Sequence, residues 1–579
     1  MRNDSKNSKE LRLRRREYTR QFYRGNHSAF LIAVLETILL AGANLMISWL
    51  MQVLIDVITG VEGRFTILET SGLCVVSIGI SVLAMWLAWL VKPRFVARAI
   101  GQYKEYVFQK VSRKGIAAFA GENTSFYLSA LSNDANSIET DYLKNIFNLL
   151  DDLLFFSGAL GLMLWYSPLL TVIGIALSLL PVAASLLAGE RVAVAEKKVS
   201  EKNEAYMSTL ADSLAGFSVV KSFKAEAAMC RQFAQRVREV TEAKTLRGKT
   251  AIVVQSMGMV AGAIAQFGVF MAGAALALGG HPISAGTLIA FVNLMNFVVS
   301  PIGTVPQYLA QYRAACRLID KLAAALEDHV REEGLQDKDT LQKGITIRDL
   351  SFGYEAGVPV LKHLNFTFET GKRYAVVGAS GCGKSTLLNL LMAAHAGYTG
   401  TICYDDTELG DLRSESLYEM VSVIQQNVFI FNASIRDNIT MFSNFPKEEV
   451  DQAIQLSGLE GLIAQRGEDY LCGENGKGLS GGEKQRVSIA RSLLKKSRVL
   501  LMDEATAALD KQTAYQVTSA ILDIDGMTSI VVTHVLDESL LRRYDGILTL
   551  KNGTVTEYGT FDQLMDKKGY FYSLFTVSQ

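Results

Sequence analysis

The stretch Gly378-Ala379-Ser380-Gly381-Cys382-Gly383-Lys384-Ser385 decides the fold of the second half of this 579-residue chain. It follows a short apolar run, 374–377, that is typical of a buried strand, and it precedes a helix-forming stretch, 386–392. The glycines let backbone N–H groups curl around phosphate oxygens, and the start of the following helix adds positive potential. A strand, this loop and a helix in that order match the P-loop pattern and predict an α/β domain that binds phosphate.

The loop supplies two side chains with defined tasks. Lys384 is expected to reach the β- and γ-phosphates of ATP, and Ser385 to ligate Mg²⁺. The residues expected around the nucleotide are Gly378, Ser380, Gly381, Cys382, Gly383, Lys384, Ser385 and Thr386.

Further polar side chains each follow a strand-like apolar run: Gln426 after 421–424, Asp503-Glu504 after 499–502, and His534 after 530–533. Each of these side chains by itself could have a purely structural role, and a lone histidine is more often structural. The carboxyl ends of parallel strands meet at one edge of a sheet, so we expect these groups to converge on the P-loop.

The charge and length of each converging side chain indicate its role at the nucleotide. Asp503 is expected to hold Mg²⁺, directly or through water, with Gln426 as a further ligand. Glu504 is placed to orient or deprotonate the attacking water, while His534 and Gln426 sense the γ-phosphate. Lys384 completes the catalytic set, because phosphoryl transfer is accelerated mainly by positioning and by neutralising charge.

A second glycine motif, Leu479-Ser480-Gly481-Gly482-Glu483, opens a helix-like stretch that continues to residue 494. It is another helix N-terminus offered to phosphate. A single domain does not need two such phosphate-binding motifs for one nucleotide. The second motif therefore predicts that two nucleotide domains close face to face over ATP.

The first half of the chain contains apolar runs long enough to cross a bilayer, which takes about 20 residues per helix. Six such runs are predicted: 29–54, 73–91, 145–166, 169–188, 251–278 and 287–309. The expected organisation is a basic segment over 1–28, an all-α domain of six membrane helices over 29–325, a solvated linker over 326–343 and the α/β domain over 344–579.

The N-terminal segment 1–28 is rich in arginine and lysine. By the positive-inside rule it lies in the cytoplasm, and six spans return the C-terminus to the same side of the cell membrane. Leucines and aromatic residues among the arginines favour an interfacial amphipathic helix on an anionic leaflet over a disordered basic tail. No small-residue cleavage pattern follows the first apolar run, so we expect an anchor rather than a cleaved signal.

Composition excludes some classes of function. The 58 lysines and arginines balance 58 aspartates and glutamates, which gives no support to a nucleic-acid partner. The six cysteines lack the spacing of a metal site or a disulfide framework, which fits a reduced cytoplasmic face.

Two features of the membrane half suggest function. The inner connections 92–144 and 189–250 are long and charged, and helical hairpins of about 50 residues would project some 35 Å into the cytoplasm. Glu36 lies inside the first span, where an acid costs about 2.5 to 3.5 kcal/mol on insertion scales. It is a candidate for recognising a cationic substrate, and the alternative is that it pairs with a basic residue or reaches the inner headgroups.

Over essentially its whole length the chain resembles the ABC exporter family, as a half-transporter of the type I (also called type IV) exporter fold. The motifs that carry the resemblance are 378–385 as Walker A, Gln426 as the Q-loop, 479–483 as the signature, 499–504 as Walker B, 508–510 as the D-loop and His534 as the switch histidine. Glu483 stands where glutamine is common in the family.

The resemblance implies an ATPase coupled to transport that works as a dimer. Ser480 and the amides of Gly481 and Gly482 in one subunit would cap ATP held by the P-loop of the other. Glu504 and the intact signature favour a homodimer, with the competent half of a heterodimer as the alternative.

The resemblance also assigns secondary sites. Tyr354 falls where the family stacks an aromatic ring on adenine, and Asp510 falls in the D-loop. Coupling helices that dock on the nucleotide domains are expected near 119–126 and 205–210, with 473–476 at that contact.

Several functions fit these features. The first is ATP-driven export of an amphipathic or hydrophobic compound such as a drug, a lipid or a peptide. The second is import of a metal-chelate complex by the same fold, and the third is a channel or regulator gated by ATP. A peptide exporter with its own peptidase is not expected, because about 28 residues before the first span are too few for a further domain of 50 or more residues.

Overall fold

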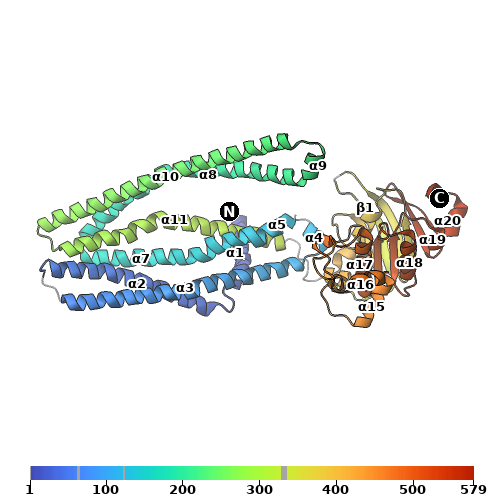
Figure 1. Cartoon of the computed structure of the whole chain (residues 1–579), viewed down its shortest axis with the longest axis horizontal. Helices are drawn as coiled ribbons and strands as arrows, with labels where there is room; N and C mark the ends of the chain where they lie inside the picture. The colour runs from blue at the N-terminus through green and yellow to red at the C-terminus, as the bar shows by residue number, and fades with distance from the viewer. Residues whose placement is uncertain (1, 62–64, 121–123, 328–335, 356, 579) are drawn as a thin grey trace. The chain divides into compact units, whose positions relative to one another are not determined.

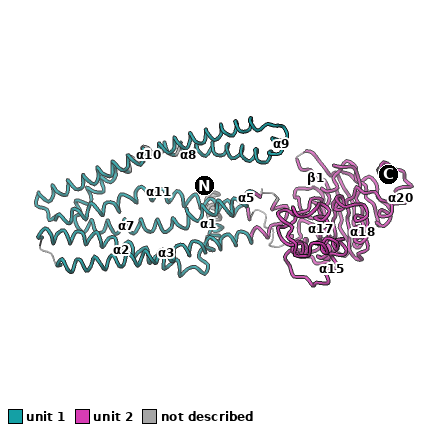
Figure 2. The backbone as a smooth tube through the Cα atoms, in the orientation of Figure 1, with its two compact units in different colours: residues 1–109, 125–324 teal, residues 110–124, 325–579 magenta. Residues whose placement is uncertain are grey.

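The computed structural model of the chain describes residues 2–61, 65–120, 124–327, 336–355 and 357–578 (Figure 1). The chain divides into two compact units (Figure 2). Unit 1 contains Met1–Gln109 and Ser125–Ala324, and unit 2 contains Lys110–Thr124 and Ala325–Gln579.

Unit 1 is built from long helices. They are α1 (Arg2–Gln21), α2 (His27–Ile58), α3 (Ile67–Ser112), α5 (Thr124–Ser129), α6 (Ala135–Ile138), α7 (Asn145–Tyr166), α8 (Pro168–Ala215), α9 (Phe217–Ser222), α10 (Glu226–Leu278) and α11 (Ala285–Glu327). Two π-helical turns, η1 (Ala130–Asp134) and η2 (Glu139–Lys144), join α5, α6 and α7 into one continuous rod. The short helix α4 (Ile116–Ala120) follows α3 and belongs to unit 2.

Five helical segments among the described residues are long and apolar enough to cross a membrane: α2, α3, the rod 124–166, α10 and α11. The apolar part of α8 is shorter and covers Pro168–Pro181. The structure therefore supports five spans by length and composition, and the span expected over 169–188 stays a prediction.

The spans continue far beyond the thickness of a bilayer. α3 has 46 residues, α8 has 48 and α10 has 53, whereas a span needs about 20. Figure 1 shows α8 and α10 side by side as a hairpin whose tip is α9. The expected coupling helix at 205–210 is wrong, because these residues lie inside α8, which continues unbroken until Gly216 caps it.

A buried apolar cluster holds the helices of unit 1 together. It contains Met163 of α7, Leu170 of α8, Val269 of α10 and Phe291 of α11, all fully shielded from solvent. Since these four residues span well over a hundred positions of the sequence, the packing of the helices rather than local propensity fixes the bundle.

Unit 2 contains two sheets. The strands are β1 (Gly344–Phe352), β2 (Leu361–Glu369), β3 (Arg373–Val377), β4 (Thr399–Tyr404), β5 (Thr407–Glu408), β6 (Val421–Ile424), β7 (Val499–Asp503), β8 (Thr528–Val532), β9 (Gly546–Lys551) and β10 (Thr554–Gly559). A four-stranded antiparallel sheet has the order β2-β1-β4-β5, and a six-stranded sheet has the order β10-β9-β3-β8-β7-β6.

The helices of unit 2 surround these sheets. They are α12 (Lys384–Leu391), α13 (Ser414–Met420), α14 (Ile435–Thr440), α15 (Lys447–Leu456), α16 (Glu460–Arg466), α17 (Gly481–Leu494), α18 (Lys511–Leu522), α19 (Glu538–Leu541), α20 (Phe561–Lys567) and α21 (Tyr570–Ser578), with 3-10 turns η3 (Leu409–Asp411) and η4 (Glu474–Gly476). One core lies between the two sheets around α12 and includes Ile347, Phe368, Leu387 and Val532. A separate core joins α14, α15 and α17.

The register of the large sheet brings four strand ends to one edge. Strand β3 pairs in parallel with β8, β8 with β7, and β7 with β6. Asp503 pairs with Val532, and Met502 with Ile424. The segments that follow β3, β6, β7 and β8 therefore start side by side, which is where parallel sheets bind ligands.

Candidate functional site

The P-loop leaves β3 and ends at the start of α12. Gly381 has a φ of 77° and Gly383 a φ of 104°, backbone conformations that residues with a Cβ rarely adopt. Lys384 is 4% exposed, and its Nζ donates hydrogen bonds to the carbonyl oxygens of Gly378 at 2.9 Å and Ala379 at 3.1 Å. The ammonium group is thus held beside the loop that would wrap a phosphate.

The other side chains of the loop differ in exposure. Ser380 is exposed, whereas the Cys382 thiol is buried against Gly378. Burial raises the pKa of the Cys382 thiol, and the nearby Lys384 ammonium only partly offsets this. The Cys382 N–H donates to the Ala379 carbonyl oxygen at 3.3 Å, and its binding to a phosphate stays a prediction.

Ser385 and Asp503 meet at the edge of the sheet. The Ser385 hydroxyl donates to Oδ1 of Asp503 at 3.0 Å. Burial raises the pKa of the Asp503 carboxyl, and the hydrogen bond from Ser385 counteracts part of this rise. Both groups present oxygen atoms, the ligand type that Mg²⁺ prefers.

Glu504 is the centre of a second group of contacts. Its Oε1 lies 2.6 Å from Nε2 of His534, and its Oε2 accepts a hydrogen bond from Nε2 of Gln426 at 3.0 Å. The backbone of Glu504 has a φ of 48°, which is uncommon for a residue with a side chain and tends to occur at functional sites. The structure thus brings together the side chains that follow β6, β7 and β8.

Tyr354 lies just after β1, next to α12. Its hydroxyl is 3.1 Å from Oγ1 of Thr386, and the residue is 58% exposed. Phe352 and His395 each meet this ring edge to face, with centroids 5.2 and 5.3 Å away. Sequence reasoning missed His395, because it lies 41 positions further along the chain and no local pattern connects it to Tyr354.

The signature residues form the start of α17. Ser480 caps this helix and Glu483 closes a capping box, with the Ser480 N–H donating to Oε2 of Glu483 at 2.7 Å. Burial raises the pKa of the Glu483 carboxyl, but the hydrogen bonds from Ser480 outweigh it and the pKa is lowered. Glu483 therefore has a structural role, because its carboxylate completes the capping box at the start of α17.

The signature and the P-loop are not joined within the described part of the chain. No hydrogen bond or ion pair found among those residues connects 479–483 to 378–385. The signature instead contacts the D-loop: Gly482 lies against Ala508, and Oε1 of Gln485 accepts the Ala508 N–H at 3.0 Å. Asp510 then caps α18 by accepting the Thr513 N–H at 3.0 Å.

Gln485 was also missed by sequence reasoning. Its side chain is 5% exposed, and it connects α17 to the segment that follows Glu504. A glutamine on a helix with mixed polarity carries no signal of its own, so only the fold reveals this contact.

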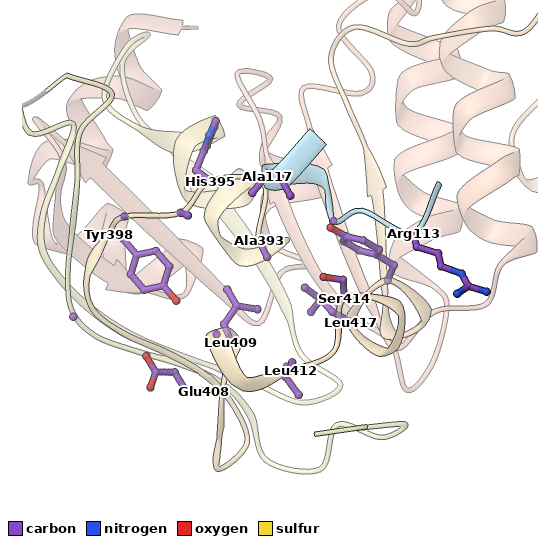
Figure 3. Close-up of a pocket in the computed structure, with 17 residues that line it drawn as sticks. Arg113, Ala117, Ala393, His395, Tyr398, Glu408, Leu409, Leu412, Ser414 and Leu417 are labelled. Atoms are coloured by element: carbon purple, nitrogen blue, oxygen red, sulfur yellow. The ribbon is translucent and has the colours of Figure 1, made fainter. Parts of the chain in front are cut away.

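Unit 2 also contains a cavity of about 380 Å³ beside α4 (Figure 3). Arg113 and Ala117 line one side, and His395, Tyr398 and Leu417 line others. The Ile116 N–H donates to the Tyr418 hydroxyl at 2.9 Å, so this segment is fastened to α13. The docked residues precede the expected coupling segment 119–126, of which 121–123 lie outside the described residues.

Glu36, the substrate candidate, is fully buried in unit 1. Its Oε2 lies 2.8 Å from Nζ of Lys92 on α3, and that ammonium is also 4.0 Å from Oδ2 of Asp151 on α7. The carboxylate is therefore occupied by an ion pair that ties helices together, which favours the structural alternative. Sequence reasoning did not identify Lys92 as its partner, although Lys92 directly follows the apolar run 73–91.

Two family comparisons agree with this architecture. Residues 30–302 match the ABC transporter transmembrane region, and residues 361–507 match the ABC transporter family. In fold, the chain is similar to a bacterial Atm1-family ABC exporter with ATP bound, with a TM-score of 0.83, 23% identity and coverage of 95% of this chain and 98% of that one.

Two named bacterial transport proteins are similar to this chain in sequence. The beta-(1→2)glucan export ATP-binding/permease protein NdvA of Rhizobium etli is 31% identical over 72% of each chain. The ATP-dependent lipid A-core flippase of Pseudomonas aeruginosa is 30% identical over 71% of this chain and 69% of its own. The chain therefore belongs to the ABC transporter family, as an exporter-type half-transporter in which ATP binding and hydrolysis are coupled to transport.

Proposed function

We propose that two copies of this chain form an exporter that moves an amphipathic or hydrophobic compound outward across the cytoplasmic membrane. The named activities of similar proteins, export of a glucan and flipping of lipid A-core, support the outward direction. A lipid-like substrate also suits a bundle whose long helices expose large apolar side chains, such as Trp86, Trp89 and Phe267.

The dimer is supported chiefly by the absence, among the described residues, of hydrogen bonds and ion pairs between the P-loop 378–385 and the signature 479–483. Among the described residues, Ser480 and the backbone amides at the start of α17 make no hydrogen bond to the P-loop of the same chain. A second copy facing the first would place its signature over the ATP bound to the P-loop. ATP would then join the two domains, and its hydrolysis would release them.

The residues at the sheet edge have separate tasks in this proposal. Lys384 exchanges the carbonyl oxygens of Gly378 and Ala379 for phosphate oxygens. Glu504 orients the attacking water and accepts its proton, while His534 and Gln426 fix the carboxylate. Tyr354 presents the exposed face of its ring to adenine.

Ser385, Asp503 and Gln426 are the residues that would hold Mg²⁺ beside the phosphates. The hydroxyl of Ser385 and the carboxylate of Asp503 already lie 3.0 Å apart. No group of three or more His, Cys, Asp or Glu in the described ranges could form a metal cage by itself. This fits Mg²⁺, which is usually bound through one or two protein ligands together with substrate phosphates. When bound, the ion would neutralise charge on the phosphates.

The tip of the α8–α10 hairpin suits contact with a partner subunit. Phe217, Val219 and Phe223 at or beside α9 are 55%, 57% and 80% exposed. Exposed apolar side chains gathered at the tip of a helical hairpin are typical of a docking surface. We propose that this tip transmits the movement of the partner's nucleotide domain to the spans.

Ser480→Arg in the full chain tests the composite site. We expect ATP turnover to fall by about 100-fold or more, since a bulky cation replaces the cap that faces the phosphates, while ATP binding to the P-loop changes by less than about threefold. Thr560→Arg is the matched control, because Thr560 closes the same kind of capping box with Gln563 on α20. Equal turnover in the two variants would remove the support for a composite site.

Direction is tested with proteoliposomes that carry the nucleotide domains outside. With external ATP and Mg²⁺, a fluorescent amphiphile should accumulate inside, and Glu504→Gln should prevent this. ATP-dependent loss of a trapped metal chelate from the same vesicles would instead indicate an importer. Downhill flux that is independent of turnover would indicate a channel.

A further inference from the structure

The N-terminal helix α1 is fixed to unit 1 by one face. Tyr18 and Phe22 are fully buried there, with ring centroids 5.4 Å from Tyr106 and 5.5 Å from Tyr103 of α3. Arg15 adds an ion pair with Asp320 of α11, with Nη2 and Oδ2 2.5 Å apart. Two residues separated by about three hundred positions thus hold α1 in a defined orientation.

The opposite side of α1 is basic and exposed. Arg16 and Arg20 lie one turn apart, and Arg24 follows in the turn that leads into α2. All three side chains are exposed, and so is Leu13, at 67%. These residues line an open hollow of about 1240 Å³ together with His27.

Among the described residues, positive charge exceeds negative charge in this hollow. Within the described ranges, no ion pair is found for Arg16, Arg20 or Arg24. The acid that lines the hollow, Glu17, accepts a hydrogen bond from the Tyr106 hydroxyl. Three guanidinium groups therefore face outward against one carboxylate, which calls for anions from outside the chain.

The hollow lies where the first membrane helix begins. Nε2 of Gln102 donates to the Arg24 carbonyl at 2.9 Å, and Nδ2 of the buried Asn26 donates to the Phe95 carbonyl at 3.0 Å. His27 starts α2, and Phe95 follows the apolar part of α3 by about one turn. These contacts hold Arg24 at the boundary between the apolar spans and the polar segments.

We infer that this arginine hollow binds the headgroup phosphate of an acidic phospholipid in the inner leaflet. Guanidinium groups make paired hydrogen bonds to phosphate oxygens, and Leu13 offers an apolar surface beside them for an acyl chain. The lipid secures the start of α2 at the membrane surface. This site is independent of the transported substrate and of the ATP site.

The test measures binding of dioctanoyl phosphatidylglycerol to the full chain in detergent, by isothermal titration. In Arg16→Gln/Arg20→Gln/Arg24→Gln we expect binding to weaken by about 10- to 100-fold, because each basic residue near an anionic headgroup contributes a factor of about five. The charge-conserving triple lysine variant should stay within about threefold to tenfold of the wild type.

The matched control removes the same charge elsewhere. Arg498, Lys567 and Lys568 are exposed on unit 2, and Arg498→Gln/Lys567→Gln/Lys568→Gln should bind the lipid as the wild type does. The inference would be overturned if dioctanoyl phosphatidylcholine bound as tightly as dioctanoyl phosphatidylglycerol, or if inorganic phosphate at the same concentration displaced the lipid. Unchanged lipid binding in Arg16→Gln/Arg20→Gln/Arg24→Gln would overturn it as well. Residual ATP binding in every variant reports that the protein is folded.

Discussion

The acid Glu36 in unit 1 and the acid Glu504 in unit 2 both lie beside a basic or polar partner, but their environments differ. Glu36 is fully buried and its Oε2 is 2.8 Å from the ammonium of Lys92. Glu504 divides its two oxygens between a 43% exposed His534 and Gln426. The first carboxylate is held inside a packed bundle, whereas the second lies at an accessible sheet edge where its partners can change.

Other polar contacts of the spans follow the pattern of Glu36. Nε2 of Gln266 donates to Asn296 at 2.5 Å, and the Thr304 hydroxyl donates to Asp152 at 2.5 Å. Each contact joins two different helices. These polar contacts of the membrane half therefore orient helices, while Gln426, Glu504 and His534 of unit 2 gather at strand ends where chemistry can occur.

Glu504→Gln should give the largest effect and tests the catalytic half of this comparison. The amide keeps the shape of the side chain and its contacts but cannot accept a proton, so we expect ATP turnover to fall by about 100- to 1,000-fold. Steady-state phosphate release measures turnover, and binding of a fluorescent ATP analogue should be retained. Glu460→Gln, an exposed acid on α16, is the control, and undiminished turnover in Glu504→Gln would refute the assigned role.

Lys92→Met should act on stability and not on chemistry. It leaves Glu36 buried without its cation, which typically costs about 3 to 5 kcal/mol. We expect a lower unfolding midpoint in detergent, followed by the fluorescence of the tryptophans, all of which lie in unit 1.

The double variant Lys92→Met/Glu36→Gln separates the two interpretations of Glu36. It should recover part of the lost stability, because no unpaired charge remains. ATP turnover per folded molecule should stay near the wild-type value. A stable double variant that loses stimulation by cationic compounds would instead restore Glu36 as a substrate residue.

The convergence of side chains at the edge of the large sheet was predictable, because the order of parallel strands fixes where the segments after them begin. Side chains directly after apolar strands must share one edge, so Gln426, Glu504 and His534 could be grouped from the sequence alone. The membrane half lacks such a rule. Where nearly every position of a helix is apolar, periodicity does not reveal the buried face, and the Lys92 partner of Glu36 was therefore missed.

The predicted position of the tip of the α8–α10 hairpin was wrong for a different reason. The prediction placed it at 205–210, before the middle of the connection 189–250, whereas the chain stays helical to Ala215 and turns at Gly216. A glycine after a long helical stretch is a typical stop signal, so Gly216 could have located the tip. Contacts between distant residues, such as Tyr354 with His395, have no comparable signal.

Tyr354→Ala tests the exposed edge of the nucleotide site. Loss of a ring that stacks on adenine should weaken ATP binding by about 10-fold, with little change in maximal turnover. Tyr354→Phe keeps the ring and removes only the hydroxyl beside Thr386, so it should change affinity by less than about threefold. Equal affinities for ATP in the alanine variant and the wild type would show that adenine lies elsewhere.

Asp405 of unit 2 gives the smallest expected effect. Like Glu36, it is a carboxylate paired with a lysine, in this case Lys338. Its carboxylate accepts the backbone N–H groups of Gln342, Lys343 and Gly344 and pairs with Lys338 at 2.9 Å. Burial raises the pKa of Asp405, but these contacts outweigh it and lower the pKa to about 2. The folded state therefore favours the ionised form.

The sign of the pH dependence follows from this lowered pKa. Asp405 stabilises the fold fully above its unfolded pKa of about 4, and the contribution is lost as the pH falls toward 2. We expect Asp405→Asn to cost about 1 to 2 kcal/mol at pH 7, discounted for solvent screening, and the difference from the wild type to shrink below pH 4. Hydrogen exchange of the peptide containing 342–344 measures the local effect, which should be faster exchange in the variant at pH 7. An unchanged exchange rate there would show that the backbone N–H groups are protected by something other than the carboxylate, and that unit 2 does not use this charge in the way unit 1 uses Glu36.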